Sequence, residues 1–476
     1  MKSSIFRKYD IRGKINEDFI LEEAYALGQS IALYFLQQLP ICKKVVVGMD
    51  GRSHSEIIKN HLIQALSDSG LDVVFIGVSP TPVMYFMMHT QAYDAGIMIT
   101  ASHNGPEYNG LKICLGKESL SEEALQDIYR LYLNQSKIIS NIAGVVSVID
   151  ANGLYVNWLV EHFAHLKNIT ISVAFDCANG TAGAIVPDLI SAFGWHGTHR
   201  LYEDVVAVPV HPADPVIEEN MRDLRQHVVI HKLELGIGFD GDCDRMAAIT
   251  ASGKLILGDI LLAVFSKDVL KYYNNAAVVY DIKCSQIVPD LLIQWGGIPY
   301  VSPSGHSLIK KGMQKYKALL AGELSGHFFF NDRYFGYDDG IYAALRLIDI
   351  MHSTGLSLDE MVSEFPAIYA TDEIRVSCPE DQKHVVIEAC ERYYQAKKDA
   401  ELSFIDGIRI VTPCGWSIIR PSNTQAVISI RCESRHPDLL EQIKYDVCEA
   451  LKGSLDQDVL YAAFFNTGDG YVAHSN

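Results

Sequence analysis

Several features are scarce or missing in this sequence, and each absence narrows the class of protein. No CxxC pair occurs among its 10 cysteines, so neither a zinc framework of that kind nor a disulfide framework is expected. The longest apolar runs, such as 276–280, have the length of a strand, far below the ~20 residues that cross a bilayer. The opening segment MKSSIFRKYDIRG has no apolar core typical of a secretory signal. We therefore expect a cytoplasmic protein without a membrane partner.

The sequence also has fewer basic than acidic residues. The chain carries 40 Lys and Arg residues against 58 Asp and Glu residues, which gives a formal net charge of −18. Most of such a surface repels a polyanion, so no nucleic-acid partner is expected. A small phosphorylated ligand is compatible with this charge if arginine and lysine gather in one cleft.

The length and pattern of the chain indicate several α/β domains. A domain usually has ~100–200 residues, so the 476 residues are expected to form two to four of them. Buried strands alternate with amphipathic helices, the pattern of α/β layers. The predicted strands span 44–48, 95–100, 171–175, 235–239, 276–280 and 318–321, and the predicted helices span 19–38, 55–69, 122–134, 341–351 and 382–398.

An internal similarity links three of the predicted strands. They end in an aspartate followed by small or polar residues, at Asp50, Asp176 and Asp281. Downstream of each aspartate, a second strand leads into one of the loops TASHNGPEYNG, GFDGDCDR and GELSGH. This favours three related α/β units over the alternative that strands of any α/β protein end in polar loops. Functional groups gather beyond the carboxyl ends of strands, so the three loops are expected to face one cleft. After a boundary near 365–372, short strands with turns predict a separate α+β domain.

The segment FDGDCDR gives the sharpest metal signal. Asp240, Asp242 and Asp244 alternate directly after an apolar strand, so a turned loop can direct three hard carboxylate oxygens at one point. Oxygen ligands of this kind suit Mg²⁺. The alternative is a solvated acidic turn. A calcium site of the EF-hand type is disfavoured, because the glycine and the distal glutamate of that loop are missing.

Ser102 follows an apolar strand within TASHNGPEYNGLKI. Nearby glycines allow the backbone to accommodate a phosphorylated hydroxyl, and Lys112 can neutralise its charge. The alternative is a turn built from turn-favouring residues. A Ser-His-Asp hydrolase is a poor rival, because the ring of the adjacent His103 is expected to point away from the serine and no GxSxG elbow occurs.

Three further loops combine groups that bind sugars or phosphates, although a turn or a solvated basic stretch explains each of them when it is taken alone. GELSGH carries acceptors and donors for sugar hydroxyls, RPSNT can surround a phosphate with a guanidinium fork and hydroxyl groups, and FRKYDIRG adds basic and phenolic groups. The side chains are Glu323, Ser325 and His327 in the first loop, Arg420, Ser422, Asn423 and Thr424 in the second, and Arg7, Lys8, Tyr9 and Arg12 in the third.

The ordered set YDIRG, TASHN, DGDCDR, GELSGH and RPSNT resembles the α-D-phosphohexomutase superfamily over the whole length of the chain. Within it, the chain looks like the bacterial phosphomannomutase/phosphoglucomutase group, since GELSGH is followed by FFFNDRYFGYDDGIYAALRL. The resemblance implies three related α/β domains with mixed sheets flanked by helices, plus a C-terminal α+β domain, in a heart-shaped arrangement around a central cleft. The implied domains are 1–145, 146–254, 255–368 and 369–476.

The same resemblance implies a phosphomannomutase, which interconverts mannose 6-phosphate and mannose 1-phosphate through a phosphoserine and a hexose 1,6-bisphosphate, and which serves GDP-mannose biosynthesis. The alternative is phosphoglucomutase activity or both activities together. A non-catalytic phosphosugar-binding protein is the less favoured reading. The implied cofactor is Mg²⁺, the partner is a small phosphosugar, and the chain is expected to be a monomer or a weak homodimer.

Residue roles follow from the same match. Ser102 is implied to be the phosphoserine and, with Asp240, Asp242 and Asp244, to hold Mg²⁺. The catalytic centre is implied to include Arg245, Arg12, Lys112, His103, Tyr9 and Lys283. Glu323 and Ser325 are implied to bind the sugar O3 and O4, helped by His306 and His327. The phosphate that is not transferred is implied to bind Arg420, Ser422, Asn423 and Thr424.

The chain departs from the family pattern at three positions. The serine loop reads SHNG with Pro106 one place later than usual, and Pro303 stands before His306 where a lysine is common. The phosphate loop has Ala426 where a proline is usual. None of these changes removes a group that the chemistry needs, but the loss of the lysine bears on substrate affinity.

Overall fold

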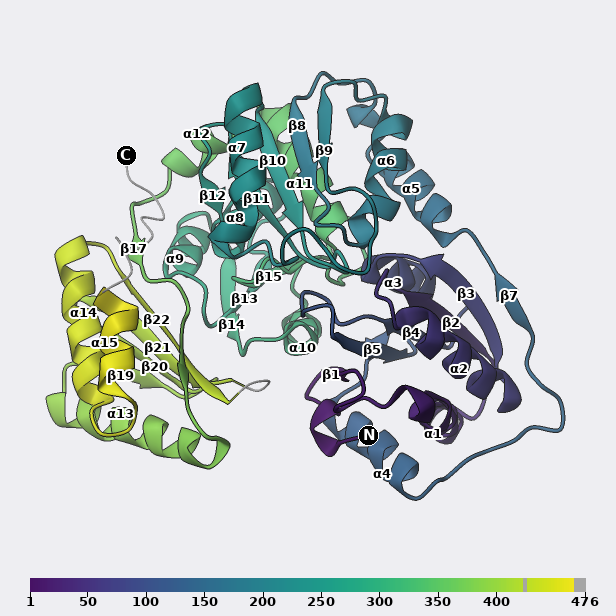
Figure 1. Ribbon diagram of the computed structural model, residues 1–476. Helices are drawn as coiled ribbons and strands as arrows, with labels where there is room; N and C mark the ends of the chain where they lie inside the picture. The colour runs from purple at the N-terminus through teal and green to yellow at the C-terminus, as the bar shows by residue number, and fades with distance from the viewer. Residues whose placement is uncertain (423–425, 466–476) are drawn as a thin grey trace. The chain divides into compact units, whose positions relative to one another are not determined.

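The computed structural model describes residues 1–422 and 426–465 (Figure 1). Two compact units divide the chain, and each is described by itself. The first unit comprises Met1–Leu261 with Leu319–Leu358, and the second comprises Leu262–Ala318 with the segment that follows from Asp359. None of the helices in the described part of the chain combines the length and apolarity that a bilayer crossing requires.

The first sheet has the strand order β1-β5-β4-β2-β3-β7, and β6 pairs with β5. It is a mixed sheet, because β2 runs parallel to β3 and β4 whereas β5 runs antiparallel to β4 and β1. Its elements are β1 (Ile11–Lys14), β2 (Lys44–Met49), β3 (Asp72–Val78), β4 (Ala95–Ile99), β5 (Tyr108–Leu115), β6 (Glu118–Ser119) and β7 (Val146–Val148), with the helices α1 (Ala24–Gln38), α2 (Ser55–Asp68), α3 (Thr81–Thr90) and α4 (Glu122–Leu133).

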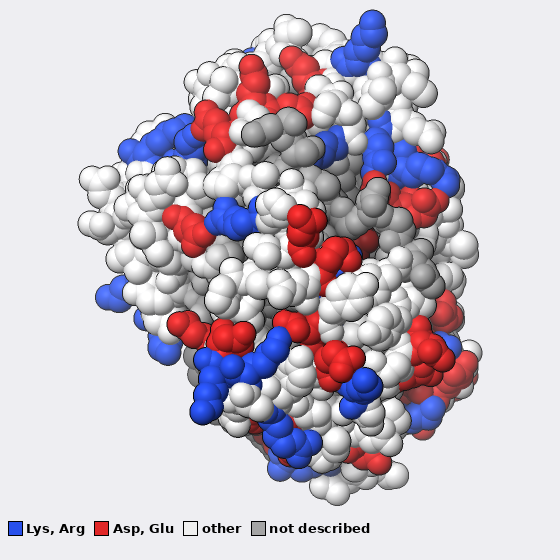
Figure 2. Space-filling view, turned by 90° about the vertical axis from the view of Figure 1, so that its left-hand side faces the viewer, with Lys and Arg blue, Asp and Glu red and all other residues white. Residues whose placement is uncertain are grey.

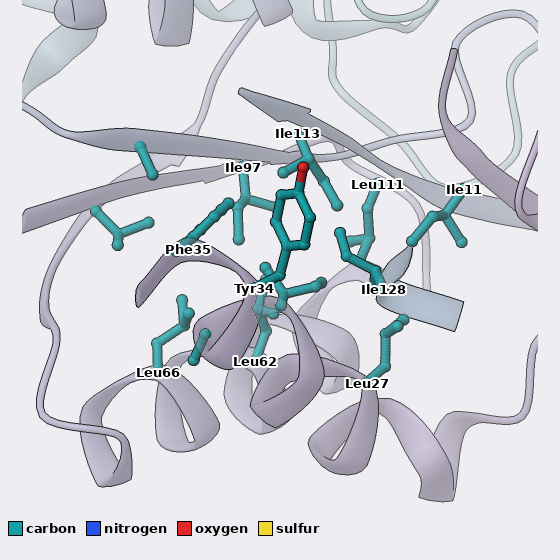
Figure 3. Packing of buried hydrophobic residues seen from close by; sticks show 14 of the residues in the cluster. Ile11, Leu27, Tyr34, Phe35, Leu62, Leu66, Ile97, Leu111, Ile113 and Ile128 are labelled. Atoms are coloured by element: carbon teal, nitrogen blue, oxygen red, sulfur yellow. The ribbon is translucent and has the colours of Figure 1, made fainter. Parts of the chain in front are cut away.

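Side-chain alternation along β4 decides which helices cover the first sheet. Ile97 joins the core formed with α1, α2 and α4 (Figure 3). Gly96, on the opposite face, lies beneath α3, where an added Cβ would meet the Met84 sulfur at 3.0 Å. Successive strand residues point to opposite faces, so helices cover both sides of the sheet. The apolar run of β4 is therefore buried on both faces.

The second sheet, in the same unit, has the order β12-β11-β10-β8-β9. It too is mixed, with β8 parallel to β9 and β10 and with β11 antiparallel to β10 and β12. Its strands are β8 (Val173–Asp176), β9 (Thr198–Leu201), β10 (Leu235–Phe239), β11 (Met246–Thr250) and β12 (Leu255–Ile256), and its helices are α5 (Ala151–His162), α6 (Val186–Phe193) and α7 (Arg222–His231). The first unit is completed by the antiparallel pair β15 (Leu320–Gly322) and β16 (Phe328–Phe330), and by α11 (Gly340–Thr354).

The second unit contains a parallel pair of strands and an antiparallel sheet. The parallel pair is β13 (Ala277–Asp281) and β14 (Ile298–Ser302), with α9 (Ile287–Gln294) and α10 (His306–Tyr316). The antiparallel sheet comprises β17 (Tyr369–Ala370), β18 (Ile374–Ser377), β19 (Glu401–Ser403), β20 (Ile408–Thr412), β21 (Gly415–Pro421) and β22 (Val427–Ser434), with α13 (Lys383–Lys397), α14 (Pro437–Ala450) and α15 (Gln457–Phe465). The chain passes between the units within α8 (Gly258–Tyr272), between Ala318 and Leu319, and at the start of α12 (Leu358–Ser363).

The α/β pattern expected from the sequence is confirmed, with local differences. The first helix begins at Ala24 instead of residue 19, because the 3₁₀ turn Leu21–Glu23 precedes it. Nine of the ten cysteines are buried. Acidic and basic side chains are interspersed on the face shown in Figure 2, so the net negative charge does not form a single patch there. The proposed domain boundaries and the arrangement around a cleft stay predictions.

The core between the first sheet and the helices α1, α2 and α4 leads to a prediction about stability. Leu62 on α2 is 1% exposed, whereas Ile57 on the same helix is 44% exposed. Leu62→Ala should lower the free energy of unfolding by ~2–5 kcal/mol, because it removes apolar contacts and leaves a cavity. Ile57→Ala, the matched control, should cost less than ~1 kcal/mol. Urea unfolding followed by circular dichroism measures both, and equal losses would contradict the burial of Leu62 in this core.

Candidate active site

Ser102 lies just beyond β4, in the first of the loops singled out in the sequence. Its backbone is left-handed, with φ of 53°, a conformation that a residue other than glycine rarely adopts. The Thr100 hydroxyl accepts the Ser102 N–H at 2.9 Å and so supports this turn. The side chain is buried, and its Oγ donates to Oδ2 of Asp240 at 2.7 Å. The hydroxyl and the carboxylate, 138 residues apart in sequence, therefore meet.

The orientation of His103 differs from the sequence-based expectation. The ring was expected to point away from the adjacent serine, but Nδ1 lies 3.1 Å from Ser102 Oγ. Adjacent side chains diverge in an extended backbone, whereas the left-handed turn at Ser102 brings the two together. The expectation was wrong for this reason, and His103 is a neighbour of the hydroxyl.

Three carboxylates gather where β10 ends. Asp240, Asp242 and Asp244 are almost completely buried, and each contributes an oxygen to a group whose members all lie within 4.8 Å of one another. Oδ1 of Asp242 and Oδ1 of Asp244 are buried without a hydrogen-bond partner in the described ranges 1–422 and 426–465. Hard carboxylate oxygens this close together are the donors that Mg²⁺ prefers. The three residues therefore fit a magnesium ion, which would be held by these carboxylates.

Two buried cations offset this negative charge. Lys112 Nζ, from β5, donates to Asp242 Oδ2 at 2.6 Å and also to Asp244. Arg245 Nε donates to Asp240 Oδ2 at 3.1 Å. Burial lowers the pKa of Lys112, but attraction to the aspartates outweighs it and raises the pKa above the ordinary value. Both cations therefore stay charged beside the carboxylates.

The ionised form of Asp240 is disfavoured by its surroundings. Burial, together with repulsion from Asp244 and Asp242, raises its pKa to about 7 against the opposing attraction of Arg245. A carboxylate pushed in this direction gains from a nearby dication, since added positive charge favours the ionised form. The raised pKa of Asp240 thus agrees with a cation site at this loop.

Two side chains that sequence reasoning missed hold this group in place. Thr81 Oγ1, at the start of α3, donates to Asp242 Oδ2 at 2.6 Å. Asp214 accepts from Arg245 Nη1 at 3.0 Å, while Arg245 Nη2 is buried with no hydrogen-bond partner in the described part of the chain. Thr81 comes three residues after the end of β3 and directly after a proline, but no local pattern distinguished Asp214. The Nη2 atom of the guanidinium is thus the donor that remains for an anion.

Arg52 fixes the backbone of the Ser102 loop. Its guanidinium donates to the carbonyls of Ser102, Asn104, Gly105 and Tyr108 at 2.6–3.1 Å. The remaining donor, Nε, bonds to Asp50 at 3.0 Å. The planar fork of arginine thereby links the whole loop to the end of β2. The DGR sequence after that strand is the signal that would have identified it.

Close backbone contacts join the serine and carboxylate loops. A Cβ at Gly241 would lie 2.5 Å from the carbonyl oxygen of Ser102, and a Cβ at Gly180 would lie 2.7 Å from the carbonyl oxygen of Gly241. Only glycine permits such an approach. A cavity of about 210 Å³ borders these loops and is lined by Ser102, His103, Asn179 and Gly241 among others. The buried serine therefore adjoins an open space.

Other predicted residues of the first unit lie around this group. Arg12 donates to Asn104 at 2.7 Å and pairs with Asp10. Tyr9 is half-buried, with the Lys8 amine 5.7 Å from its ring centroid.

The GELSGH loop lies beside the carboxylate loop, with Gly326 O accepting the N–H of Met246 at 3.1 Å. Within it, Ser325 Oγ donates to Glu323 Oε2 at 3.0 Å. His327 Nδ1 lies 3.2 Å from Asp338 and 3.6 Å from Asp244. Burial lowers the pKa of His327, but these aspartates raise it to about 9. The imidazole thus extends the charged group towards the predicted sugar loop.

The remaining predicted residues belong to the second unit. Lys283 Nζ lies 3.9 Å from Asp281 and 3.8 Å from Glu373. Arg420 pairs with Asp406 at 3.0 Å, and Asp406 also accepts the N–H of Ser304 at 3.3 Å. His306 is the first residue of α10, and the Ser422 carbonyl accepts from the buried Lys383 at 2.7 Å. Asn423 and Thr424 lie outside the described residues. Lys383 is a cation next to the predicted phosphate loop. The sequence did not predict this role for Lys383.

The fit of the three aspartates to a magnesium ion leads to a prediction about metal binding. Asp242→Asn should weaken Mg²⁺ or Mn²⁺ affinity at least about tenfold, because it replaces a charged ligand with a neutral one. Isothermal titration calorimetry measures this directly. Asp188→Asn, at an exposed position of α6, is the control and should bind as the unmodified chain does. Equal affinity in the two variants would remove Asp242 from the ion site.

A second prediction concerns loop order. Arg52→Lys should raise amide hydrogen exchange in residues 102–108 at least about tenfold, since lysine cannot reproduce the five directed donors. Arg130→Lys, at an exposed arginine of α4, is the control. Hydrogen exchange read by mass spectrometry compares them. Unchanged protection of the loop in Arg52→Lys would contradict the anchoring role.

Comparison with known proteins identifies the family of this chain. The chain matches the four domains described as "Phosphoglucomutase/phosphomannomutase", with alpha/beta/alpha domains I, II and III over residues 3–138, 154–253 and 257–369 and the C-terminal domain over residues 373–450. It is 38% identical to a phosphomannomutase/phosphoglucomutase of Pseudomonas aeruginosa over 93% of this chain and 94% of that protein. A phosphoglucomutase of Neisseria gonorrhoeae is 34% identical over 92% of this chain and 95% of its own length.

A solved structure gives the same result. The crystal structure of a phosphoglucomutase/phosphomannomutase family protein from Burkholderia thailandensis superposes with a TM-score of 0.87 at 30% identity, covering 95% of this chain and 98% of that one. The fold expected from the sequence is thus confirmed, with three α/β domains followed by a C-terminal domain built on an antiparallel sheet. The chain belongs to the phosphoglucomutase/phosphomannomutase family of α-D-phosphohexomutases.

Proposed function

We propose that this phosphohexomutase interconverts mannose 6-phosphate and mannose 1-phosphate, with Ser102 as the phosphate carrier and a hexose 1,6-bisphosphate as the intermediate. The observation that carries the proposal is the 2.7 Å contact between Ser102 Oγ and a carboxylate of the buried aspartate group. Arg245 Nε donates to the same Asp240 Oδ2 that accepts from Ser102 Oγ, so a phosphate on Oγ would lie near this guanidinium.

The chemistry proceeds by two phosphoryl transfers. A free sugar hydroxyl attacks the phosphorus of phosphorylated Ser102, a new sugar O–P bond forms, and the bond between phosphorus and Oγ breaks. The bisphosphate then turns around and returns its other phosphate to Oγ. The hydroxyl loses a proton and Oγ gains one. Lys283 is our candidate for proton transfer or for charge stabilisation. Asp240 and His103 are within hydrogen-bond distance of Oγ and can exchange that proton.

The protein contributes charge compensation and positioning, which dominate catalysis of phosphoryl transfer. Lys112 and Arg245 are fixed cations in a buried setting, where their field acts with little screening. Mg²⁺ bound to the aspartates would supply further positive charge against the transferring phosphate. Arg420 and Ser422, with Asn423 and Thr424, are proposed to hold the phosphate that is not being transferred.

The choice of sugar depends on the GELSGH loop, whose sequence is close to the phosphomannomutase group. Glu323 and Ser325 are proposed to bind O3 and O4, with His306 and His327 in support. Mannose and glucose differ only at O2, which these contacts avoid, so phosphoglucomutase activity is the second candidate. The names of the Pseudomonas and Neisseria relatives support keeping both sugars.

An isomerisation assay tests the sugar assignment. The chain is incubated with Mg²⁺ and a catalytic amount of hexose 1,6-bisphosphate, and mannose 1-phosphate, glucose 1-phosphate and glucosamine 6-phosphate are compared in parallel. The highest kcat/KM is expected for mannose 1-phosphate, followed by glucose 1-phosphate. A clear preference for glucosamine 6-phosphate, or release of inorganic phosphate in place of isomerisation, would overturn the proposal.

Intact-mass analysis tests the carrier. After incubation with hexose 1,6-bisphosphate, the unmodified chain should gain one phosphate, and Ser102→Ala should gain none and lose at least about a thousandfold in kcat, since covalent transfer is blocked. Ser53→Ala, an exposed serine in another loop of the first sheet, is the control and should be phosphorylated normally. A phosphate on Ser102→Ala would place the carrier elsewhere.

A further inference from the structure

Three histidines gather on the second sheet, away from the aspartate group. His199 lies in β9, the edge strand of that sheet, and His227 and His231 lie in the last two turns of α7 (Figure 1). Residues four apart on a helix project from the same face. The ring centroids are 4.2 Å apart for His227 and His231, 4.9 Å for His199 and His227, and 5.1 Å for His199 and His231. The rings thus form one cluster from two elements.

One pair of nitrogen atoms in this cluster is close to the spacing of metal ligands. His227 Nε2 lies 2.9 Å from His199 Nδ1. Two nitrogens bound tetrahedrally to Zn²⁺ at the usual bond length are about 3.3 Å apart, so a small separation of the two rings admits an ion. Among the described residues, the nitrogens of the three rings do not all lie within 4.8 Å of one another, so His231 has to turn towards that point to bind. Its exposure leaves the ring room to do so. A solvent molecule can complete the coordination.

The local charges permit a cation. Arg200 is paired with Glu203 at 3.1 Å, and Arg225 is paired with Glu218, so the neighbouring arginines are neutralised. The site also lies at the C-terminal end of α7, whose dipole favours positive charge. Imidazole nitrogen selects Zn²⁺, Cu²⁺ or Ni²⁺, whereas the carboxylates near Ser102 select Mg²⁺. We propose that His199, His227 and His231 form a second metal site, for a divalent transition metal with zinc as the best fit.

The position of this histidine site gives it a structural consequence. β9 and α7 flank the segment 202–221, which carries Asp214, the residue that contacts Arg245 at 3.0 Å. Tyr202 at one end of the segment donates to Asp223 beyond the other end at 2.7 Å. A metal ion shared by β9 and α7 adds a second link between the two ends. Bound metal therefore restricts the segment that positions Arg245, independently of the sugar the enzyme uses.

Zinc binding is measured on the tag-free chain, stripped of metal and then kept in excess Mg²⁺ so that the aspartate site is saturated. Calorimetric titration with Zn²⁺ should show one ion per chain. His227→Gln combined with His231→Gln should weaken binding at least about tenfold, whereas His196→Gln, an exposed histidine of the same domain, should bind normally. The tetrahedral site should also give Co²⁺ a visible absorption band that the double variant lacks.

The outcomes separate the two metal sites. Binding that survives in the double histidine variant, or that disappears in Asp242→Asn, would overturn the histidine site. The Asp242→Asn variant is expected to keep its zinc binding. This result would stand even if the proposed mutase activity failed. Zinc should also slow hydrogen exchange in residues 202–221 of the unmodified chain and not of the double variant. If zinc leaves hydrogen exchange in residues 202–221 unchanged, bound metal does not restrict that segment.

Discussion

The burial of three carboxylates at one point is the constraint on which the first unit depends. Two charges 4 Å apart near a protein surface repel by roughly 4 kcal/mol, and Asp240, Asp242 and Asp244 are almost fully buried. Their nearest cations come from different sheets, since Lys112 is in β5 and Arg245 directly precedes β11. The charge balance therefore exists only when the first and second sheets pack together. Electrostatics thus couples the assembly of the two sheets to the formation of the site.

Close backbone contacts between the serine loop and the carboxylate loop also require the first and second sheets to pack in one specific way. Gly241 and the carbonyl of Ser102 approach too closely for any side chain to lie between them, and Arg52 holds four carbonyls of the serine loop. These contacts set the position of Ser102 Oγ with no contribution from the groups that react with it. The site is preorganised by its supporting structure, which is what phosphoryl transfer by charge and position requires.

The sequence predicted those parts of the fold and site that are encoded locally. The strands at Lys44–Met49 and Leu235–Phe239 show as continuous apolar runs, and the three aspartates show because they fall within one short loop. Thr81, Asp214 and Lys383 were missed, because their roles arise from contacts between distant segments. The error at His103 had another cause. A single residue with left-handed backbone reversed the usual divergence of neighbouring side chains, and sequence pattern does not reveal φ at a serine.

The left-handed backbone at Ser102 also bears on which amino acid can serve as the carrier. Threonine has the same hydroxyl and accepts phosphate in many proteins, so reactivity alone does not distinguish it from serine. A branched Cβ is strongly disfavoured at φ of 53°, and the carbonyl of this residue is already fixed by Arg52. Steric selection at the main chain, rather than nucleophilicity, thus restricts this position to the unbranched alcohol.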